Sequence, residues 1–268
     1  MKNFMLIANS GKAEAIRMAK QVGEKLVSLG CVCTESPRED TECVLVFGGD
    51  GTLLQAAREF RDRHLPFLGI NLGNLGYLAE VDRDHVDDAI RQLVEGQVSF
   101  EERMMLRGRV ARGEEILYED VALNDIAIGG RGLTVLHFKV YVDGEYLTTY
   151  QADGMVVATP TGSTGYNLSA GGPVVNPRAS LIVLTPVSPH TLISRSIVLE
   201  SRSVVELEMM EHPSRKNALG LAAFDGNEVA ELLPGDRIEI CRASETVRLI
   251  KYNKQSFLEA LRKKMGDR

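Results

Sequence analysis

Residues 43–52 read CVLVFGGDGT, and this stretch decides how the first part of the chain folds. Residues 43–47 are all apolar, which is typical of a strand buried on both faces of a parallel sheet. Residues 52–63 repeat apolar side chains at helical spacing and predict a helix after the turn. That stripe consists of Leu53, Leu54, Ala56, Ala57 and Phe60. A strand, a glycine-rich turn and a helix in this order predict a ligand site at the carboxyl end of the strand.

The turn Gly48-Gly49-Asp50-Gly51-Thr52 favours a phosphate ligand. Small residues let the backbone approach a phosphate, and a helix N-terminus offers unpaired N–H groups and the positive end of its dipole. Asp50 stands out, because a carboxylate repels phosphates unless it holds Mg²⁺ or accepts a proton from an attacking hydroxyl. An aspartate is ionised at neutral pH, so it can act as a base without special tuning. The alternative is that Asp50 only caps the helix.

Strands and helices alternate through the rest of the first 97 residues. Strands are expected at 4–8 and 66–70, with a further strand starting at Val32, and helices at 13–29 and 85–94. This alternation predicts a doubly wound α/β domain with a parallel sheet over residues 1–97. The C-terminal segment 250–268 is expected to complete that domain, with an amphipathic helix at 254–265.

A second glycine-rich segment, NLGNLGY at 71–77, follows the strand at 66–70 and is expected to lie beside Asp50. Two familiar phosphate motifs are missing. Leu6 stands where a P-loop ending in Gly11-Lys12 needs its first glycine, and Gly69, Gly73 and Gly76 do not have dinucleotide-fold spacing. The chain is therefore predicted to be neither a P-loop nucleotide hydrolase nor a standard dinucleotide-dependent dehydrogenase.

Helical periodicity is scarce over residues 98–249, which predicts a largely antiparallel β domain. Asp143-Gly144 is expected to form a tight hairpin turn. The expected strands are 105–110, 116–123, 135–142, 145–150, 155–159, 197–199, 204–210, 219–224 and 237–240.

Residues 159–173, TPTGSTGYNLSAGGP, form a long run of small and polar residues in this β domain. Hydroxyls of Thr161, Ser163 and Thr164 are suited to donate to phosphate oxygens, and Tyr166 to stack on a base or bond a ribose. The alternative is an ordinary surface loop.

Three further polar residues adjoin predicted strands. Asn124 offers the donors and the acceptor that read an adenine edge, and Asp125 and Asp153 are suited to accept from ribose hydroxyls or a carboxamide. Taken alone, each of the three also fits a turn.

Composition excludes several classes of function. The 268 residues carry a net charge of −6 and no block of Lys and Arg, which argues against a general nucleic-acid or membrane-surface binder. No apolar run is long enough to cross a bilayer or form a signal-peptide core. The four cysteines lack Cys-x-x-Cys spacing, and the five histidines lack metal-ligand spacing. We therefore expect a cytoplasmic protein with no metal ligands of its own.

Taken together, these motifs resemble those of the bacterial-type ATP/polyphosphate-NAD kinase family. The resemblance covers nearly the whole chain in order and spacing, and its most specific part is 159–173. The glycine-aspartate turn is shared more widely, with phosphofructokinases and with diacylglycerol and sphingosine kinases. The segments that carry the resemblance are 48–52, 71–77, 122–125, 153–154, 159–173, 184–190 and 225–227.

The resemblance implies an N-terminal α/β domain and a C-terminal β domain that hold both nucleotides in the crevice between them, with Asp50 as general base. It implies that Asn124 and Asp125 bind the adenosine part of NAD, that Asp153 contacts the nicotinamide end or its ribose, and that Asn227 closes the site. The full set of implied nucleotide-binding residues is Gly48, Gly49, Gly51, Thr52, Asn74, Tyr77, Asn124, Asp125, Asp153, Thr159, Thr161, Ser163, Thr164, Gly165, Tyr166, Ser169 and Asn227.

The implied reaction is phosphoryl transfer from ATP, or from polyphosphate in some members, to the 2′-hydroxyl of the adenosine ribose of NAD. The resemblance also implies Mg²⁺ or another divalent ion bound with the nucleotide phosphates. It further implies a homodimer or homotetramer formed through the β domain, in which a neighbour completes the NAD site. Two alternatives remain open: a lipid or sugar kinase with the same turn, and a non-catalytic NAD(P)-binding sensor.

Four positions depart from the commonest family pattern. Asp125 stands where many members have Glu, Gly165 where Ala is common, Gln151 where many have Arg, and Asn227 where Gln is frequent. Losing the Arg removes a partner for a phosphate or carboxylate. These changes bear on NAD affinity and on the choice between NAD and NADH rather than on the reaction class.

Overall fold

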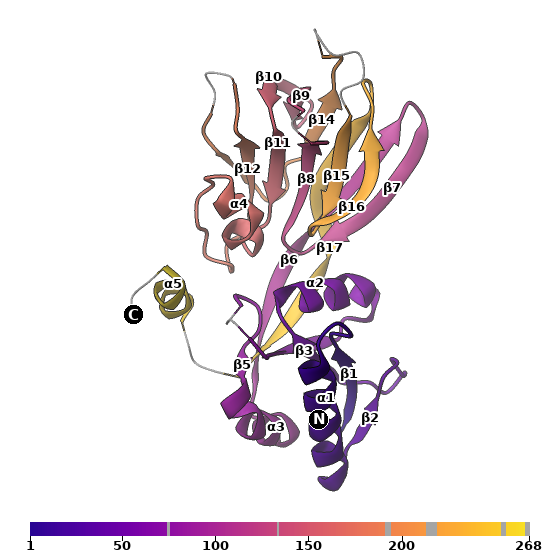
Figure 1. Ribbon diagram of the computed structural model, residues 1–268, viewed down its shortest axis with the longest axis vertical. Helices are drawn as coiled ribbons and strands as arrows, with labels where there is room; N and C mark the ends of the chain where they lie inside the picture. The colour runs from indigo at the N-terminus through magenta and orange to yellow at the C-terminus, as the bar shows by residue number, and fades with distance from the viewer. Residues whose placement is uncertain (74–75, 133, 191–193, 213–218, 253–255, 266–268) are drawn as a thin grey trace. The chain divides into compact units, whose positions relative to one another are not determined.

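The computed structural model describes the chain except residues 74–75, 133, 191–193, 213–218, 253–255 and 266–268 (Figure 1). It divides into two compact units. Unit 1 contains residues 1–103 and 246–268, and unit 2 contains residues 104–245. The chain passes between the units within two long strands, β6 (Ser99–Arg112) and β17 (Arg237–Lys251). The functional domain limits 1–97, 98–249 and 250–268 stay predictions.

Unit 1 is built on a parallel sheet, as the alternation of strands and helices predicted. Its order is β17–β4–β3–β1–β2, and β5 pairs with β4. All six residues of β3 and all six of β4 are buried, which explains their continuous apolar composition. The remaining strands of this sheet are β1 (Asn3–Ala8), β2 (Val32–Thr34), β3 (Cys43–Gly48), β4 (Pro66–Asn71) and β5 (Val81–Asp82).

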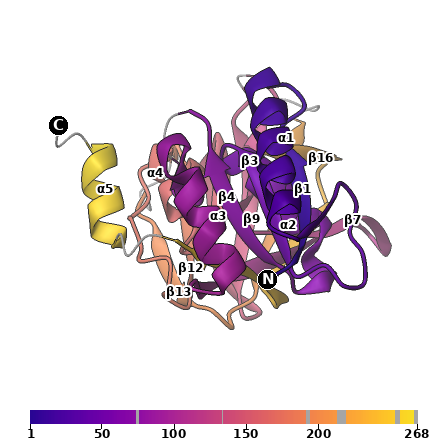
Figure 2. The same ribbon diagram turned by 90° about the horizontal axis from the view of Figure 1, so that it is seen from below.

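Helices pack against both faces of this sheet. α1 (Ala13–Ser28) and α3 (Val86–Glu95) contribute to one apolar core cluster with β1, β3 and β4, and Figure 2 shows both on the same side of the sheet. α2 (Asp50–Glu59) packs against β3 and β4. The helix predicted at 52–63 instead begins at Asp50 and ends at Glu59, and a short 3₁₀ turn, Arg61–Arg63, follows. The predicted C-terminal helix is α5 (Phe257–Met265).

Unit 2 is antiparallel, as predicted. One sheet has the order β13–β12–β11–β8–β15–β16, and the other contains β10–β9–β14–β17 with β6 paired to β17 and β7. Side chains of both sheets form one large core cluster, in which Phe138 stacks on Tyr150 at 5.8 Å. The remaining strands are β7 (Glu115–Ala122), β8 (Asp125–Gly130), β9 (Leu136–Val142), β10 (Glu145–Ala152), β11 (Gly154–Ala158), β12 (Leu181–Val187), β13 (Ile197–Glu200), β14 (Val205–Met209), β15 (Gly220–Phe224) and β16 (Asn227–Leu232).

Three strands of unit 2 were not predicted: β8, β12 and β16. β8 ends in two glycines, and Pro186 lies in β12, so local strand propensity is weakened in both. The strands predicted at 105–110 and 237–240 are parts of the longer β6 and β17. Among the helices of the described residues, none is long and apolar enough to cross a membrane.

Candidate active site

The Asp50 carboxylate is held by backbone N–H groups of another loop. Its Oδ2 accepts from the N–H of Tyr77 at 2.7 Å, and its Oδ1 accepts from Leu78 at 3.2 Å and Ala79 at 3.3 Å. The helix begins after Gly49, whose position as N-cap carries no side-chain hydrogen bond. The structure therefore corrects the capping alternative: Asp50 does not cap α2, and it ties the start of α2 to the segment after β4. The same contacts place the two glycine-rich segments beside each other, as expected.

Two glycines beside Asp50 are required by close packing. A Cβ on Gly76 would lie 1.8 Å from Asp50 Oδ1, and one on Gly48 would lie 2.5 Å from Thr52 Oγ1. Both distances are far below van der Waals contact, so a larger residue would displace these side chains.

Gly49 and Gly51 are different, because a Cβ at either position would meet no described atom within 4 Å. Packing within the described chain does not require glycine there. The open space on this side of the turn is where a ligand can approach the backbone closely.

That open space is a cavity of about 450 Å³ in unit 1, which we call the turn pocket. Gly49, Gly51 and Thr52 line it together with Asn9 and Lys12 from the loop after β1. Asn9 Nδ2 donates to Thr52 Oγ1 at 3.1 Å, and this hydrogen bond holds the two side chains together where they line the pocket. The pocket combines a helix N-terminus, open glycines and a lysine, the groups that bind phosphate.

Asn9 and Lys12 were not predicted as site residues, although the sequence carried a signal for them. The segment 9–12 follows the first strand of the sheet and was considered only as a failed P-loop. In parallel sheets the carboxyl ends of neighbouring strands share one edge. The end of β1 therefore lies next to the end of β3, with which it pairs in parallel.

Tyr77 is partly buried next to Asp50, and its pKa is raised by burial and by the charge of Asp50. Its backbone N–H donates to Asp50 Oδ2, so this predicted nucleotide-binding residue also has a structural role. Asn74 lies outside the described residues.

In unit 2, Asp225 organises the residues predicted to bind adenosine. Its Oδ1 accepts from the N–H of Asn124 at 2.7 Å and of Asp125 at 3.3 Å, and its Oδ2 accepts from Leu123 at 3.0 Å. Asp225 occupies the turn between β15 and β16 with a left-handed φ of 49°. Within residues 225–227, the sequence predicted a role only for Asn227, and the role of Asp225 was missed.

Asp125 is the most perturbed carboxyl of the site. Its side chain is buried at the first residue of β8, whereas the sequence analysis placed it at the end of the preceding strand. Burial, and after it the charge of Asp225, raises the pKa of Asp125 to about 7.

Gly165 lies beside both predicted adenosine-binding residues. A Cβ there would lie 3.6 Å from Asn124 Nδ2 and 3.8 Å from Asp125 Oδ2, which is ordinary contact. The nearest atom, the carbonyl oxygen of Gly162, would be at 3.3 Å and would need to yield slightly. The structure therefore brings Asn124, Asp125 and Gly165 together in one corner of unit 2.

The stretch 159–173 folds into a 3₁₀ turn (Gly162–Thr164) and a short helix, α4 (Tyr166–Ser169). Thr159 Oγ1 donates to the carbonyl of Leu123 at 2.6 Å, and Ser163 Oγ donates to the carbonyl of Pro160 at 2.7 Å. Both side chains are fully buried. Their hydroxyl protons are used inside the protein, so they shape the stretch, while their proposed ligand contacts stay predictions.

Asn167 is a structural residue of this stretch that the sequence analysis missed. It is fully buried, its Nδ2 donates to the carbonyls of Ser163 and Pro173, and its Oδ1 accepts from Thr185 Oγ1 at 2.7 Å. Among the predicted binding residues of the stretch, the more accessible ones are Thr164, Gly165, Tyr166 and Ser169.

Two other predicted residues lie at the ends of strands. Asp153 is exposed, and its N–H donates to the carbonyl of Val187 at 3.0 Å. Asn227 is exposed, and its Nδ2 donates weakly to the carbonyl of Phe224 at 3.4 Å. Thr161 is buried in the 159–173 stretch.

A glycine-rich turn that carries a fixed carboxylate and borders an open pocket, on a parallel sheet followed by an antiparallel unit, fits a phosphotransferase that acts on an alcohol group. The family model for the ATP-NAD kinase N-terminal domain matches residues 32–98, and that for the ATP-NAD kinase C-terminal domain matches residues 123–252. The chain belongs to the NAD kinase family. The predicted family and enzyme class are confirmed.

Individual relatives agree with this assignment. A protein named NAD kinase from Agathobacter rectalis is 42% identical over 284 residues, which cover 100% of this chain and 99% of the relative. A NAD kinase from Lachnospira eligens is 39% identical over 293 residues, which cover 99% of this chain and 100% of the relative.

Solved structures confirm the fold. A yeast NADH kinase in complex with NADH aligns with a TM-score of 0.90 and 22% identity, covering 100% of this chain and 88% of that one. A NAD kinase from Archaeoglobus fulgidus in complex with ATP aligns with a TM-score of 0.75 and 24% identity, covering 95% of each chain.

Proposed function

We propose that this protein transfers the terminal phosphoryl group of ATP to the 2′-hydroxyl of the adenosine ribose of NAD, giving NADP and ADP. The observation that carries the proposal is the Asp50 carboxylate, fixed by three backbone N–H groups at the start of the helix that borders the turn pocket. Family membership supports the choice of NAD as the acceptor.

In the proposed reaction, Asp50 accepts the proton of the attacking hydroxyl. The ribose oxygen forms a bond to phosphorus, the bond from phosphorus to the bridging oxygen of ADP breaks, and the proton moves to the carboxylate. Oδ2 accepts one backbone N–H in the structure, and a carboxylate oxygen has two lone pairs. One lone pair therefore remains for the hydroxyl, and the backbone bonds keep it in a fixed direction.

The turn pocket supplies the sites for the phosphates. Gly49, Gly51, Thr52 and Lys12 line one cavity, and we propose that their backbone N–H groups, hydroxyl and ammonium bind the phosphates. Charge neutralisation and positioning are the main contributions that a protein makes to phosphoryl transfer.

A divalent ion such as Mg²⁺ fits this donor set as a companion of the nucleotide. Among the described residues, no three His, Cys, Asp or Glu side chains gather as a metal site. Mg²⁺ commonly binds through one or two carboxylates, substrate phosphates and water. Asp50 is the carboxylate at the turn that would assist the phosphate oxygens in holding it. The ion would draw electron density from the transferred phosphoryl group.

Unit 2 supplies the groups that we propose for NAD. Asn124 and Asp125 bind its adenosine, Asp153 binds the nicotinamide end or its ribose, and Asn227 closes over it. Thr161, Thr164, Gly165, Tyr166 and Ser169 line the remainder. The assembly that we propose is a homodimer or homotetramer formed through the β-rich part of the chain, acting in the cytoplasm.

The test is NADP formation from NAD, ATP and Mg²⁺, read with an NADP-specific dehydrogenase. We expect Asp50→Asn to lower kcat by ~10²–10⁴ with little change in the Kd for NAD measured by calorimetry. Near-normal kcat in Asp50→Asn would refute the base role. Absence of NADP with folded, NAD-binding wild type would refute the kinase activity.

A further inference from the structure

The segment that holds the Asp50 carboxylate is followed by a buried glutamate. The backbone N–H groups of residues 77–79 donate to Asp50, and Glu80 is the next residue in the chain. The side chain of Glu80 is only 11% exposed. A carboxylate that is buried to this degree needs a charged or hydrogen-bonding partner to stay ionised.

Lys251 of β17 is that partner. Its Nζ donates to Glu80 Oε1 and lies 3.9 Å from Glu101 Oε2. Glu101 is in turn paired with Arg103, whose Nη2 lies 3.2 Å from Glu101 Oε1. The four side chains carry two positive and two negative charges, and each is at most 20% exposed. We call them the charge cluster, and all four belong to unit 1.

The charge cluster connects the segment after β4 to two long strands. Glu101 and Arg103 lie in β6, which pairs with β17. Glu80 lies between β4 and β5 in a stretch without regular secondary structure. Its N–H donates to the carbonyl of Gly69 in β4 at 3.1 Å, and its side chain bonds β17. Two strands therefore hold the residue that follows the Asp50-binding N–H groups.

The ion pair is the part of this arrangement that a substitution can remove selectively. Burial raises the pKa of Glu80, and the charge of Lys251 opposes that rise. Removing one partner of a buried pair leaves the other charge uncompensated. We expect the segment to relieve this by moving Glu80 toward water, which draws residues 77–79 away from Asp50. A displacement of about 1 Å at a reacting group can cost a large factor in rate.

We propose that Glu80 is a positioning residue, whose ion pair with Lys251 fixes the backbone of residues 77–79 and thereby the direction of the Asp50 carboxylate. The proposal rests on the proposed function, in which Asp50 accepts a proton, and adds the residues that aim it. Neither Glu80 nor Lys251 lines the turn pocket. Their effect should therefore fall on the rate of transfer and not on the binding of nucleotides.

The first test measures the segment itself by hydrogen–deuterium exchange and mass spectrometry, without nucleotide. In Glu80→Gln, we expect the amides of residues 77–79 to exchange on the order of tenfold faster than in wild type, while peptides from α3 stay unchanged. Unchanged exchange at 77–79 would overturn the proposal. This measurement needs no turnover, so its result is separate from that of the proposed function.

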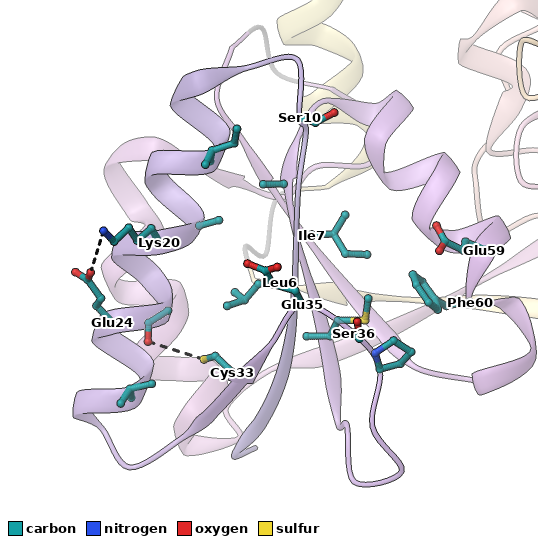
Figure 3. Close-up of a pocket in the computed structure, with 17 residues that line it drawn as sticks. Leu6, Ile7, Ser10, Lys20, Glu24, Cys33, Glu35, Ser36, Glu59 and Phe60 are labelled. Carbon is teal, nitrogen blue, oxygen red and sulfur yellow. Dashed lines mark hydrogen bonds and ion pairs between the residues drawn. The ribbon is translucent and has the colours of Figure 1, made fainter.

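The matched control is Glu24→Gln, the same substitution in an exposed ion pair of unit 1. Figure 3 shows this pair on α1: Glu24 Oε1 lies 4.0 Å from Lys20 Nζ, and the Glu24 side chain is 68% exposed. Exposed pairs contribute little to stability, so the variant should exchange and turn over like wild type. Equal impairment of Glu24→Gln and Glu80→Gln would overturn the proposal.

The second test separates kcat from KM. Glu80→Gln and Lys251→Met should each lower kcat on the order of tenfold, with the KM values for NAD and ATP within about twofold of wild type. Lys251→Arg keeps the positive charge and should retain most of kcat. An unchanged kcat in Glu80→Gln, with or without a raised KM, would overturn the proposal. Absence of NADP from wild type would instead refute the proposed function, and the exchange test would still decide the positioning role.

The double variant Glu80→Gln/Lys251→Met distinguishes positioning from a general structural role. It leaves no uncompensated charge, because Glu101 and Arg103 still pair with each other, so its melting temperature should return toward that of wild type. Its kcat should stay as low as in the single variants, because nothing then bonds residue 80 to β17. Recovery of kcat together with the melting temperature would overturn the proposal. Should a single variant not fold, this comparison with wild type decides.

Discussion

At the residue scale, the glycines around Asp50 divide into those that packing requires and those that it leaves free. Gly76 and Gly48 have neighbouring side chains closer than a Cβ tolerates, whereas Gly49 and Gly51 face open space. The first pair serves the fold, and the second pair leaves room for a ligand. Substitutions at the two kinds of glycine therefore have different expected effects on stability.

Gly51→Ala should separate stability from phosphate binding. Gly51 lies inside α2, where Ala is favoured over Gly by about 0.5–1 kcal/mol, so the melting temperature should hold or rise. The new methyl group lies in the turn pocket and should raise the KM for ATP about tenfold. Thermal unfolding and ATP titrations check both. A normal KM for ATP would show that the phosphates bind elsewhere.

Gly76→Ala should damage both fold and chemistry. Its Cβ would lie 1.8 Å from Asp50 Oδ1, so the carboxylate or the 76–79 segment must move. We expect a lower melting temperature and a kcat reduced by at least about tenfold, since base geometry sets the rate. Gly73→Ala is the control, because a Cβ there meets no described atom within 4 Å. Equal behaviour of the two variants would contradict this account.

Asp125 should make stability depend on pH. Its pKa is raised to about 7, so the folded state binds more protons than the unfolded state from about pH 4 to 7. Stability from this group is therefore present at low pH and is lost as the pH rises through 7. Asp125→Asn removes the charge. The free energy of unfolding of this variant should therefore exceed that of wild type by an amount that grows to on the order of 3 kcal/mol above pH 8. Urea unfolding without nucleotide at pH 5 and 8 measures this difference. A difference that shrinks with rising pH would contradict the raised pKa of Asp125.

At the element scale, one turn holds another in place. The turn between β15 and β16 presents Asp225, whose carboxylate accepts the N–H groups of Leu123, Asn124 and Asp125 between β7 and β8. The Asp225 N–H in turn donates to the carbonyl of Asp125 at 2.9 Å. The proposed adenosine-binding residues therefore owe their backbone conformation to a hairpin a hundred residues further along the chain.

Asp225→Ala should loosen that corner. The substitution leaves three N–H groups without their acceptor and places Ala at a left-handed φ, at a cost of about 2–4 kcal/mol. Asp225→Asn keeps an acceptor oxygen and tolerates the left-handed conformation, so it should lose less. Chemical unfolding and the KM for NAD are the measurements. Equal losses in both variants would point to the charge rather than the hydrogen bonds.

At the scale of the whole molecule, unit 1 is discontinuous in sequence. Residues 246–268 return to it, where Arg248 and Leu249 pair in parallel with Pro66 and Phe67 of β4. Ile250 is fully buried in the core of unit 1, and the Tyr252 hydroxyl donates to Asp88 at 2.6 Å. The central strand next to the glycine-aspartate turn therefore depends on the end of the chain.

Two truncations test this dependence. Ending the chain after Glu245 removes the β17 residues that pair with β4, and we expect an insoluble or protease-sensitive product. Ending it after Tyr252 keeps β17 and Ile250, and we expect a folded protein. Solubility, circular dichroism and limited proteolysis compare the two. A stable, soluble product ending at Glu245 would contradict the structural role of this segment.

The sequence by itself determined the class of fold and the family. Neighbouring residues determine the buried strand at 43–47, the glycine-aspartate turn and the helix after it. Hydrophobic periodicity therefore predicts these elements directly. Strand content in the second unit followed from the same local signals, except where β8, β12 and β16 carry glycine or proline or lack clear alternation. Asp50 was predicted to be the chemically active residue from its place in the glycine-rich turn and from the family resemblance, and that role stays a proposal.

Only the tertiary structure decided what holds these residues. The Asp50 carboxylate accepts hydrogen bonds from N–H groups 27 to 29 residues later in the sequence, and the Asp225 carboxylate accepts them from N–H groups 100 to 102 residues earlier. Such pairings depend on which strand ends meet, and no local pattern encodes that. For the same reason the sequence did not show that Thr159 and Ser163 are buried and that their hydroxyls donate within the protein; their ligand contacts stay predictions. Local order is set by near neighbours, and the partners of a polar side chain are set by the packing of distant elements.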